Sequence, residues 1–356
     1  MFHEILIAVM AGFAVLGAAD RIFGNRWGLG KEFEEGILAM GSLALAMVGI
    51  VSLAPVLANL LKPVVVPIFG FLGADPAMFA GTILACDMGG GALAMQMTEN
   101  RDAALLGGVL NGSMLGATIV FTIPVAMGIL KEQDRPAMAK GILCGIVTIP
   151  IGVLAGGIAA GFPIVMVLRN LIPIVLIAVL IVLGLWRAEQ AMVKGFAAFG
   201  KIVVIVVTIG LAAAIVEALT GFVIIPGMAP ISEGFATVGT IAIILAGAFP
   251  LVFVLTKLLR RPLMAVGGRL GINDAAAAGL IASLANSIAT FGMVKDMNER
   301  GKVVNIAFAV SAAFVFGDHL GFTAGFAPEM IGPMIIGKLV GGVSAVAVAL
   351  WLTKKD

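Results

Sequence analysis

The sequence predicts an all-α polytopic membrane protein, and three observations support this prediction. Hydrophobic residues make up 61% of the 356 residues and charged residues only 12%, which gives a mean hydropathy of +1.16. Apolar runs that are long enough to cross about 30 Å of hydrocarbon recur from one end of the chain to the other. These runs do not alternate polar and apolar residues, as the strands of a membrane barrel would. We therefore expect one membrane domain over residues 1–356.

Charge and cysteine content exclude several classes of function. The net charge of +2 is nearly neutral and predicts no nucleic-acid partner. Cys86 and Cys144 lie inside apolar runs, and two His with two Cys are too few for a zinc site. Residues 195–201 and 332–338 fit GxxxxGK but lack the following Ser or Thr, so ATP binding is rejected. We expect no metal and no cofactor, and because no activated nucleophile is present, we expect no enzyme.

Eleven apolar segments follow one another along the chain, separated by polar or Pro/Gly-rich connectors. They cover residues 4–22, 36–60, 76–98, 103–130, 138–160, 164–186, 199–219, 234–257, 275–294, 303–324 and 331–353. The third and ninth segments are the polar, interrupted ones.

The third segment contains Asp87 followed by three consecutive glycines, Gly89 to Gly91. A carboxylate at membrane depth costs roughly 2.5–3.5 kcal/mol, so it needs a partner or a task. Each glycine lowers helix propensity by about 1 kcal/mol, which predicts that the helix breaks near Asp87. Broken helices are tolerated in membranes where protein buries them or water reaches them. The segment is therefore interpreted as a transport site, which makes residues 1–356 a single membrane transport domain.

An internal duplication is indicated because a shift of 198 residues lays Glu35 on Glu233 and Gly81 on Gly279. Segments one to five then resemble segments seven to eleven. The predicted repeats are about 4–160 and 199–353, with a linker helix at 164–186. Asp87 falls opposite Asn286 or Ser287, so both copies are polar at the same place.

The distribution of Lys and Arg tests the topology through the positive-inside rule. If all eleven segments cross the membrane, the two sides carry similar numbers of basic residues. If segments three and nine are re-entrant, Lys62 and Arg101 lie outside, Arg169 and Lys338 lie within apolar segments, and all other Lys and Arg lie inside. This favours about nine spanning helices, two re-entrant or discontinuous segments and inverted repeats. The alternative is 10–11 full transmembrane helices.

Asp87 has three interpretations. It receives a cationic substrate, it caps a half-helix that begins near Ala92, or it binds a coupling proton or sodium ion. Gly89, Gly90 and Gly91 form the turn and permit close approach to a ligand, or they serve close helix packing.

Asn286, Ser287 and Thr290 form the polar tip of the second interrupted segment. They bond a substrate hydroxyl or satisfy the backbone groups that the interruption frees. Asn111 and Ser113 flank a GxxxGxxxG packing face and are candidates to line the path.

Asp318 and His319 lie near the middle of segment ten. A buried Asp–His pair can relay protons or gate a path, because His changes charge near physiological pH. The structural alternatives are a pair with Lys338 or exposure at the outer interface.

Five runs of the sequence resemble the ethanolamine permease family of bacterial ethanolamine-utilisation operons (EutH-like). They read DRIFGN from Asp20, LGKEFEEG from Leu29, SLAPVL from Ser52, CDMGG from Cys86 and FGDHLGF from Phe316. The resemblance covers essentially the whole length. It implies a multi-pass protein of the bacterial inner (cytoplasmic) membrane, embedded in the lipid bilayer, that imports ethanolamine.

The implied substrate fits the predicted site. A primary alkylammonium stays protonated at neutral pH, as a Lys side chain does. We expect Asp87 to bind the ammonium and Asn286 or Ser287 to bind the hydroxyl, with alternating access around them. Alternatives are a cation-coupled transporter of another small amine or amino acid, and a small-cation channel. The sequence leaves the coupling ion and homo-oligomer formation open.

Overall fold

The computed structural model describes residues 2–353, and every regular element in this part is helical. The all-α class is thus confirmed. Lys354 and Lys355, which the predicted topology places inside, lie outside the described residues. The α-helices are α1 (Phe2–Ile22), α2 (Leu29–Phe71), α3 (Ala77–Ile83), α4 (Gly90–Met97), α5 (Arg101–Leu105), α6 (Ile123–Ile129), α7 (Arg135–Ile146), α8 (Ile149–Ala159), α9 (Ile164–Thr220), α10 (Ile231–Leu270), α11 (Asp274–Ala285), α12 (Ser287–Met293), α13 (Glu299–Ala312), α14 (Asp318–Phe326) and α15 (Ile331–Leu352). The 3₁₀ turns are η1 (Cys86–Met88), η4 (Glu132–Asp134), η5 (Val294–Asp296) and η6 (Pro328–Met330), and the π-helical stretches are η2 (Leu106–Gly116) and η3 (Thr118–Thr122).

Seven helical stretches among the described residues are long and apolar enough to cross a membrane. They are His3–Ile22, Leu29–Phe71, Arg101–Ile129, Glu132–Ala159, Ile164–Thr220, Ile231–Leu258 and Pro328–Leu352. The chain is therefore a helical membrane protein. The number of nine spans stays a prediction.

The two segments predicted at 164–186 and 199–219 correspond to α9, in which two helices meet at a kink. Its 57 residues would extend about 85 Å as a straight helix, far more than one hydrocarbon core. The helix bends at Ala188, where φ is −145° and ψ is 48°. The two predicted segments are thus two helices that meet at this kink.

The predicted interruptions of segments three and nine are confirmed. The third segment consists of α3, η1 and α4, and the ninth consists of α11 and α12 separated at Asn286. Segment ten is also broken, between α13 and α14, and this break was not predicted.

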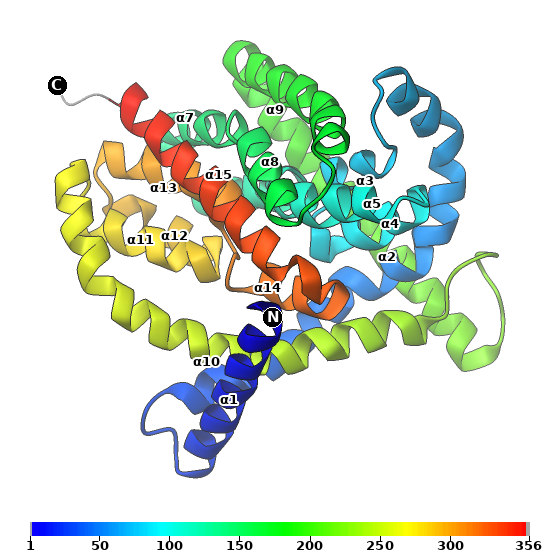
Figure 1. Ribbon diagram of the computed structural model, residues 1–356, viewed down its shortest axis with the longest axis horizontal. Helices are drawn as coiled ribbons and strands as arrows, with labels where there is room; N and C mark the ends of the chain where they lie inside the picture. Colours follow the sequence, from blue (N-terminus) through cyan, green and yellow to red (C-terminus); the bar gives the residue numbers. More distant parts are fainter. Residues whose placement is uncertain (1, 354–356) are drawn as a thin grey trace.

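The breaks are brought together by the packing of the long helices. Helix α2 packs along α10 and α9, and α15 packs against α8 and α13. Figure 1 shows α3 to α5 on one side of the molecule and α11 to α13 on the other, with α14 between them. Helix α14 contacts both α10 and η1. The first broken segment therefore meets the start of α14.

Candidate functional site

A cavity of about 330 Å³ lies where the broken helices meet. Four of the predicted site residues, Asp87, Asn286, Asp318 and His319, line it. The other lining residues are Ser42, Leu43, Ala46, Ala85, Met88, Ala117, Phe121, Ile288 and Phe314. Mostly apolar walls with a few convergent polar groups are typical of small-molecule sites.

Asp87 projects from a stretch of backbone that is not α-helical. Leu84 and Ala85 are extended, with ψ of 143° and 151°, and Gly89 is left-handed at φ 94°. The amide of Gly90 donates to the Ala85 carbonyl at 2.9 Å, which closes the turn. The N-cap of α4 is Gly89, and no side chain caps that helix. The Asp87 carboxylate therefore does not serve as a helix cap and faces the cavity.

The glycines around Asp87 serve close packing. A Cβ at Gly89 would collide with Ile50 of α2, and a Cβ at Gly91 would lie 2.6 Å from the Phe322 ring. The predicted GxxxGxxxG face also packs here, since a Cβ at Gly112 would lie 3.1 Å from the Cys86 nitrogen. These contacts hold the broken segment in place.

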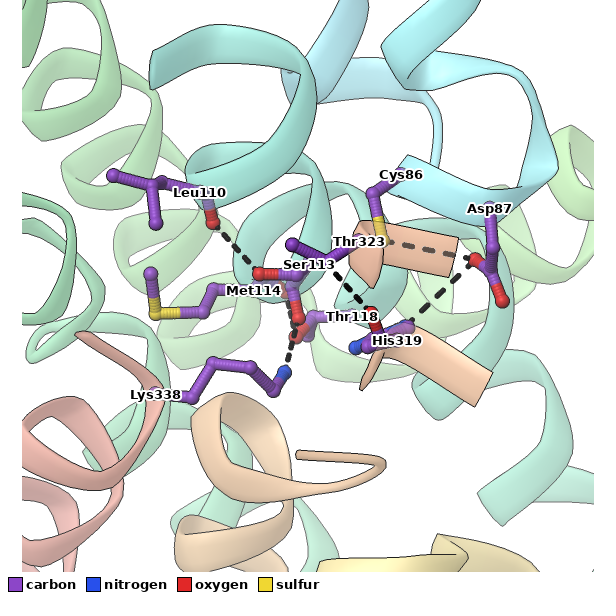
Figure 2. A network of polar contacts seen from close by, with 9 residues as sticks. All are labelled: Cys86, Asp87, Leu110, Ser113, Met114, Thr118, His319, Thr323 and Lys338. Atoms are coloured by element: carbon purple, nitrogen blue, oxygen red, sulfur yellow. Dashed lines mark hydrogen bonds and ion pairs between the residues drawn. The ribbon is translucent and has the colours of Figure 1, made fainter. Parts of the chain in front are cut away.

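His319 is positioned by the break between α13 and α14. Phe314 is left-handed at φ 62°, and its amide donates to the Ser283 carbonyl at 3.0 Å. The His319 ring packs against the Phe314 ring at 5.2 Å between centroids. The side chain is 3% exposed, and its Nε2 lies 3.7 Å from Asp87 Oδ1. The buried His319 and the half-buried Asp87 therefore form a pair at the cavity wall (Figure 2).

Asn286 occupies the break of the second interrupted segment. Its backbone is extended, and its Oδ1 caps α12 by accepting from the Ile288 amide at 2.8 Å. Its Nδ2 makes no hydrogen bond with a described residue and can donate to a ligand. Asn286 thus satisfies a freed backbone group and also presents a donor at the cavity.

The remaining predicted residues lie beside the cavity. Gly89 and Gly90 form the turn that follows Asp87 in the chain. Asn111 is buried and donates to Thr82 at 3.1 Å, and the buried Ser287 hydroxyl has no partner among the described residues. Thr290 bonds the Gly279 carbonyl and the hydroxyl of Ser283. Roles for these residues in substrate binding stay predictions.

The apolar lining of the cavity and the burial of Lys338 were not predicted from the sequence. Ser42, Phe121 and Phe314 carry no sequence signal, because hydroxyl and aromatic residues are common in membrane helices. Lys338 is 1% exposed, and its Nζ donates to the Ser113 carbonyl at 2.5 Å. Figure 2 shows this ammonium on the far side of His319 from Asp87.

One group of side chains has the chemistry of a metal site. The Cys86 sulfur, the Asp87 carboxylate and the His319 imidazole have donor atoms within 4.8 Å of one another. Such a set could hold a borderline-soft cation.

Comparison with known proteins gives full-length matches. A family model described as "Ethanolamine utilisation protein, EutH" matches residues 2–352. The chain is 62% identical over 353 residues to a protein of Listeria monocytogenes named "Probable ethanolamine permease EutH", covering 99% of this chain and 95% of that protein. A Salmonella typhimurium protein with the same name is 48% identical over 392 residues, with 99% and 96% covered. A Bacillus subtilis protein, "Uncharacterized protein YxeR", is 53% identical over 351 residues, with 99% and 95% covered. No solved structure matches.

Proposed function

This chain belongs to the EutH family of ethanolamine utilisation proteins, a permease family, and from this premise we propose that it imports ethanolamine, as the ammonium cation, by alternating access. The membrane is then the bacterial inner membrane. One observation carries the proposal. Asp87, from the first interrupted segment, and Asn286, from the second, line the same cavity.

The chemistry of this pair suits an amino alcohol. An alkylammonium needs a carboxylate that is shielded from water. The Asp87 carboxylate is available for this role because it does not cap a helix. The substrate hydroxyl needs a neutral partner, and Asn286 Nδ2 can donate to its oxygen. Ile288, Phe121 and the other apolar lining residues exclude water and leave the carboxylate as the main attraction.

The duplication is supported by matching local structure. The long helices α2 and α10 each lead into two short helices around a break. Asn100 and Asn298 are 198 residues apart, and each caps the helix after its broken pair, α5 and α13. Two inverted repeats that meet at a central site are the usual frame of alternating access.

The inverted topology is supported by two ion pairs. Arg101 and Glu329 are 2.6 Å apart, and both fall outside in the predicted topology. Lys302 and Asp134 are 2.7 Å apart, and both fall inside. Each pair joins different segments at one end of the molecule.

The test is uptake of labelled ethanolamine by proteoliposomes. Asp87→Asn keeps the shape of the side chain but removes its charge, so we expect uptake to fall to background. Glu132→Gln removes an exposed carboxylate, 87% accessible, and should transport at the wild-type rate. Uptake by Asp87→Asn at the wild-type rate would remove Asp87 from the mechanism.

The same assay separates ethanolamine transport from the other functions. Weak competition by unlabelled ethanolamine against other labelled amines, with dependence on a sodium or proton gradient, would favour a coupled transporter of another amine. Non-saturable flux without exchange would favour a channel.

A further inference from the structure

Three charged groups with different surroundings lie around the cavity. Asp87 and Asp318 line it directly, and Lys338 of α15 lies behind its wall. Asp318 is the first residue of α14, where the helix dipole favours a negative charge. The cavity is therefore built with two carboxylates.

The Lys338 ammonium has few hydrogen-bond acceptors around it for a buried cation. Its ammonium carries three N–H donors, and the Ser113 carbonyl is the one acceptor that the described residues supply. A buried ammonium is costly unless a negative charge opposes it. A residue that only filled space between α15 and η2 would not need this charge.

His319 lines the cavity on the side of Lys338, as seen in Figure 2. Its Nε2 faces Asp87, and its Nδ1 is fully buried without a hydrogen-bond partner in the described part of the chain. In Figure 2 the ring lies between the Lys338 ammonium and the Asp87 carboxylate. Because a protein interior screens charges weakly, the buried Lys338 ammonium acts on the cavity carboxylates through space although Lys338 does not line the cavity.

We propose that Lys338 is the built-in counter-cation of this two-carboxylate site and limits it to one substrate charge. Two carboxylates and one ammonium leave a net charge of about −1, which a single alkylammonium such as ethanolamine neutralises. A diamine with two ammonium groups overcompensates the site and is rejected. This inference rests on the proposed function and adds a basis for its selectivity.

The test is competition against labelled ethanolamine by unlabelled ethanolamine and by 1,3-diaminopropane, which carries two charges at neutral pH. Lys338→Gln can still donate to the Ser113 carbonyl but lacks the charge. We expect the ratio of the two inhibition constants to shift toward the diamine by about tenfold or more, because one charge of repulsion is lost. Lys338→Arg keeps the charge and should keep the wild-type ratio.

A double variant checks the charge count. Asp318→Asn with Lys338→Gln removes one charge of each sign and should restore the preference for ethanolamine. If Lys338→Gln alone does not fold, Asp318→Asn is compared with the double variant. The double variant should then bind ethanolamine about tenfold more tightly, because it regains the net negative charge.

The outcomes separate the two proposals. A wild-type ratio in Lys338→Gln, or equal affinity of Asp318→Asn and the double variant, overturns the role of Lys338 and leaves the proposed function standing. Wild-type protein that neither binds nor transports ethanolamine overturns both.

Discussion

At the residue scale, Gly89 combines a left-handed backbone with a close neighbour on α2. Its φ of 94° is unfavourable for residues with a side chain, by roughly 1–2 kcal/mol, and a Cβ there would collide with Ile50. We expect Gly89→Ala to lower the melting temperature of the purified protein and to reduce uptake. The double variant Gly89→Ala with Ile50→Ala should recover only the part of the lost melting temperature that the collision with Ile50 causes. Gly41→Ala, where a Cβ meets nothing within 4 Å, is the control, and equal melting of the two single variants would contradict this account.

Asn286 should determine how strongly the site prefers an amino alcohol over a simple amine. Asn286→Ala removes the Nδ2 donor and also the cap on α12. Loss of the cap affects all substrates alike, whereas loss of the donor affects only substrates with a hydroxyl. We expect the preference for ethanolamine over ethylamine to fall by about tenfold, as for one hydrogen bond. The measurement is competition by the two amines, and an unchanged preference would assign the hydroxyl to another group.

The polar members of the site were predictable because charge and amide groups are rare in apolar runs. Asp87, Asn286, Asp318 and His319 stand out from their neighbours in the sequence and do share one cavity. The sequence did not distinguish Asn286 from Ser287, because which neighbour faces the cavity depends on the extended backbone at 286.

At the element scale, Lys302 links the start of α13 to the 3₁₀ turn η4, which precedes α7, through an ion pair. It contacts Asp134 and Glu299, each at 2.7 Å, and Asp134 is buried. We expect Lys302→Met to destabilise the protein by about 3 kcal/mol, because the buried Asp134 loses its counter-charge. Asp134→Asn combined with Lys302→Met should recover part of this loss in thermal unfolding. If the double variant is no more stable than the single one, the pair is not the cause.

The same contacts predict how the ion pair responds to pH. The contact with the Asp134 carboxylate, together with the hydrogen bond to Glu299, raises the pKa of Lys302. The stabilisation from Lys302 is therefore complete below the pKa of an unfolded lysine, about 10.4, and is lost as the pH rises through the higher folded value.

The break between α13 and α14 shows where sequence patterns stop being informative. Residues 312–317 contain no proline, and Gly317 is their single glycine, so nothing local ends the helix at Ala312. The chain turns there because the amides of Phe314 and Phe316 bond to the carbonyls of Ser283 and Leu284 at the end of α11. These tertiary contacts override helix propensity.

At the scale of the whole molecule, the orientation of the chain can be tested by labelling single introduced cysteines. Cys86 and Cys144 are buried, so the native protein provides a low background. We expect an impermeant maleimide added outside to label cysteines at Lys62 and Arg101, and cysteines at Lys257 and Arg300 only after the membrane is opened. Labelling at Lys257 from outside would exclude two re-entrant segments with the predicted orientation.

The class of protein followed from composition, but the number of crossings did not. Hydropathy marks apolar runs, and it cannot tell two helices that meet at a kink, such as the two parts of α9 at Ala188, from two helices that are separated by a loop. It also cannot tell a short pair such as α11 and α12 from one continuous span.

The cavity is walled by the ends of short helices: the turn at Asp87, the gap at Asn286 and the bend at Phe314. These breaks interrupt the regular helical hydrogen bonding, so they are the places where neighbouring helices can change their relative orientation. A substrate that contacts two of these breaks at once links the helices on either side of them. Substrate binding can therefore change the orientation of these helices directly, without coupling through a distant part of the protein.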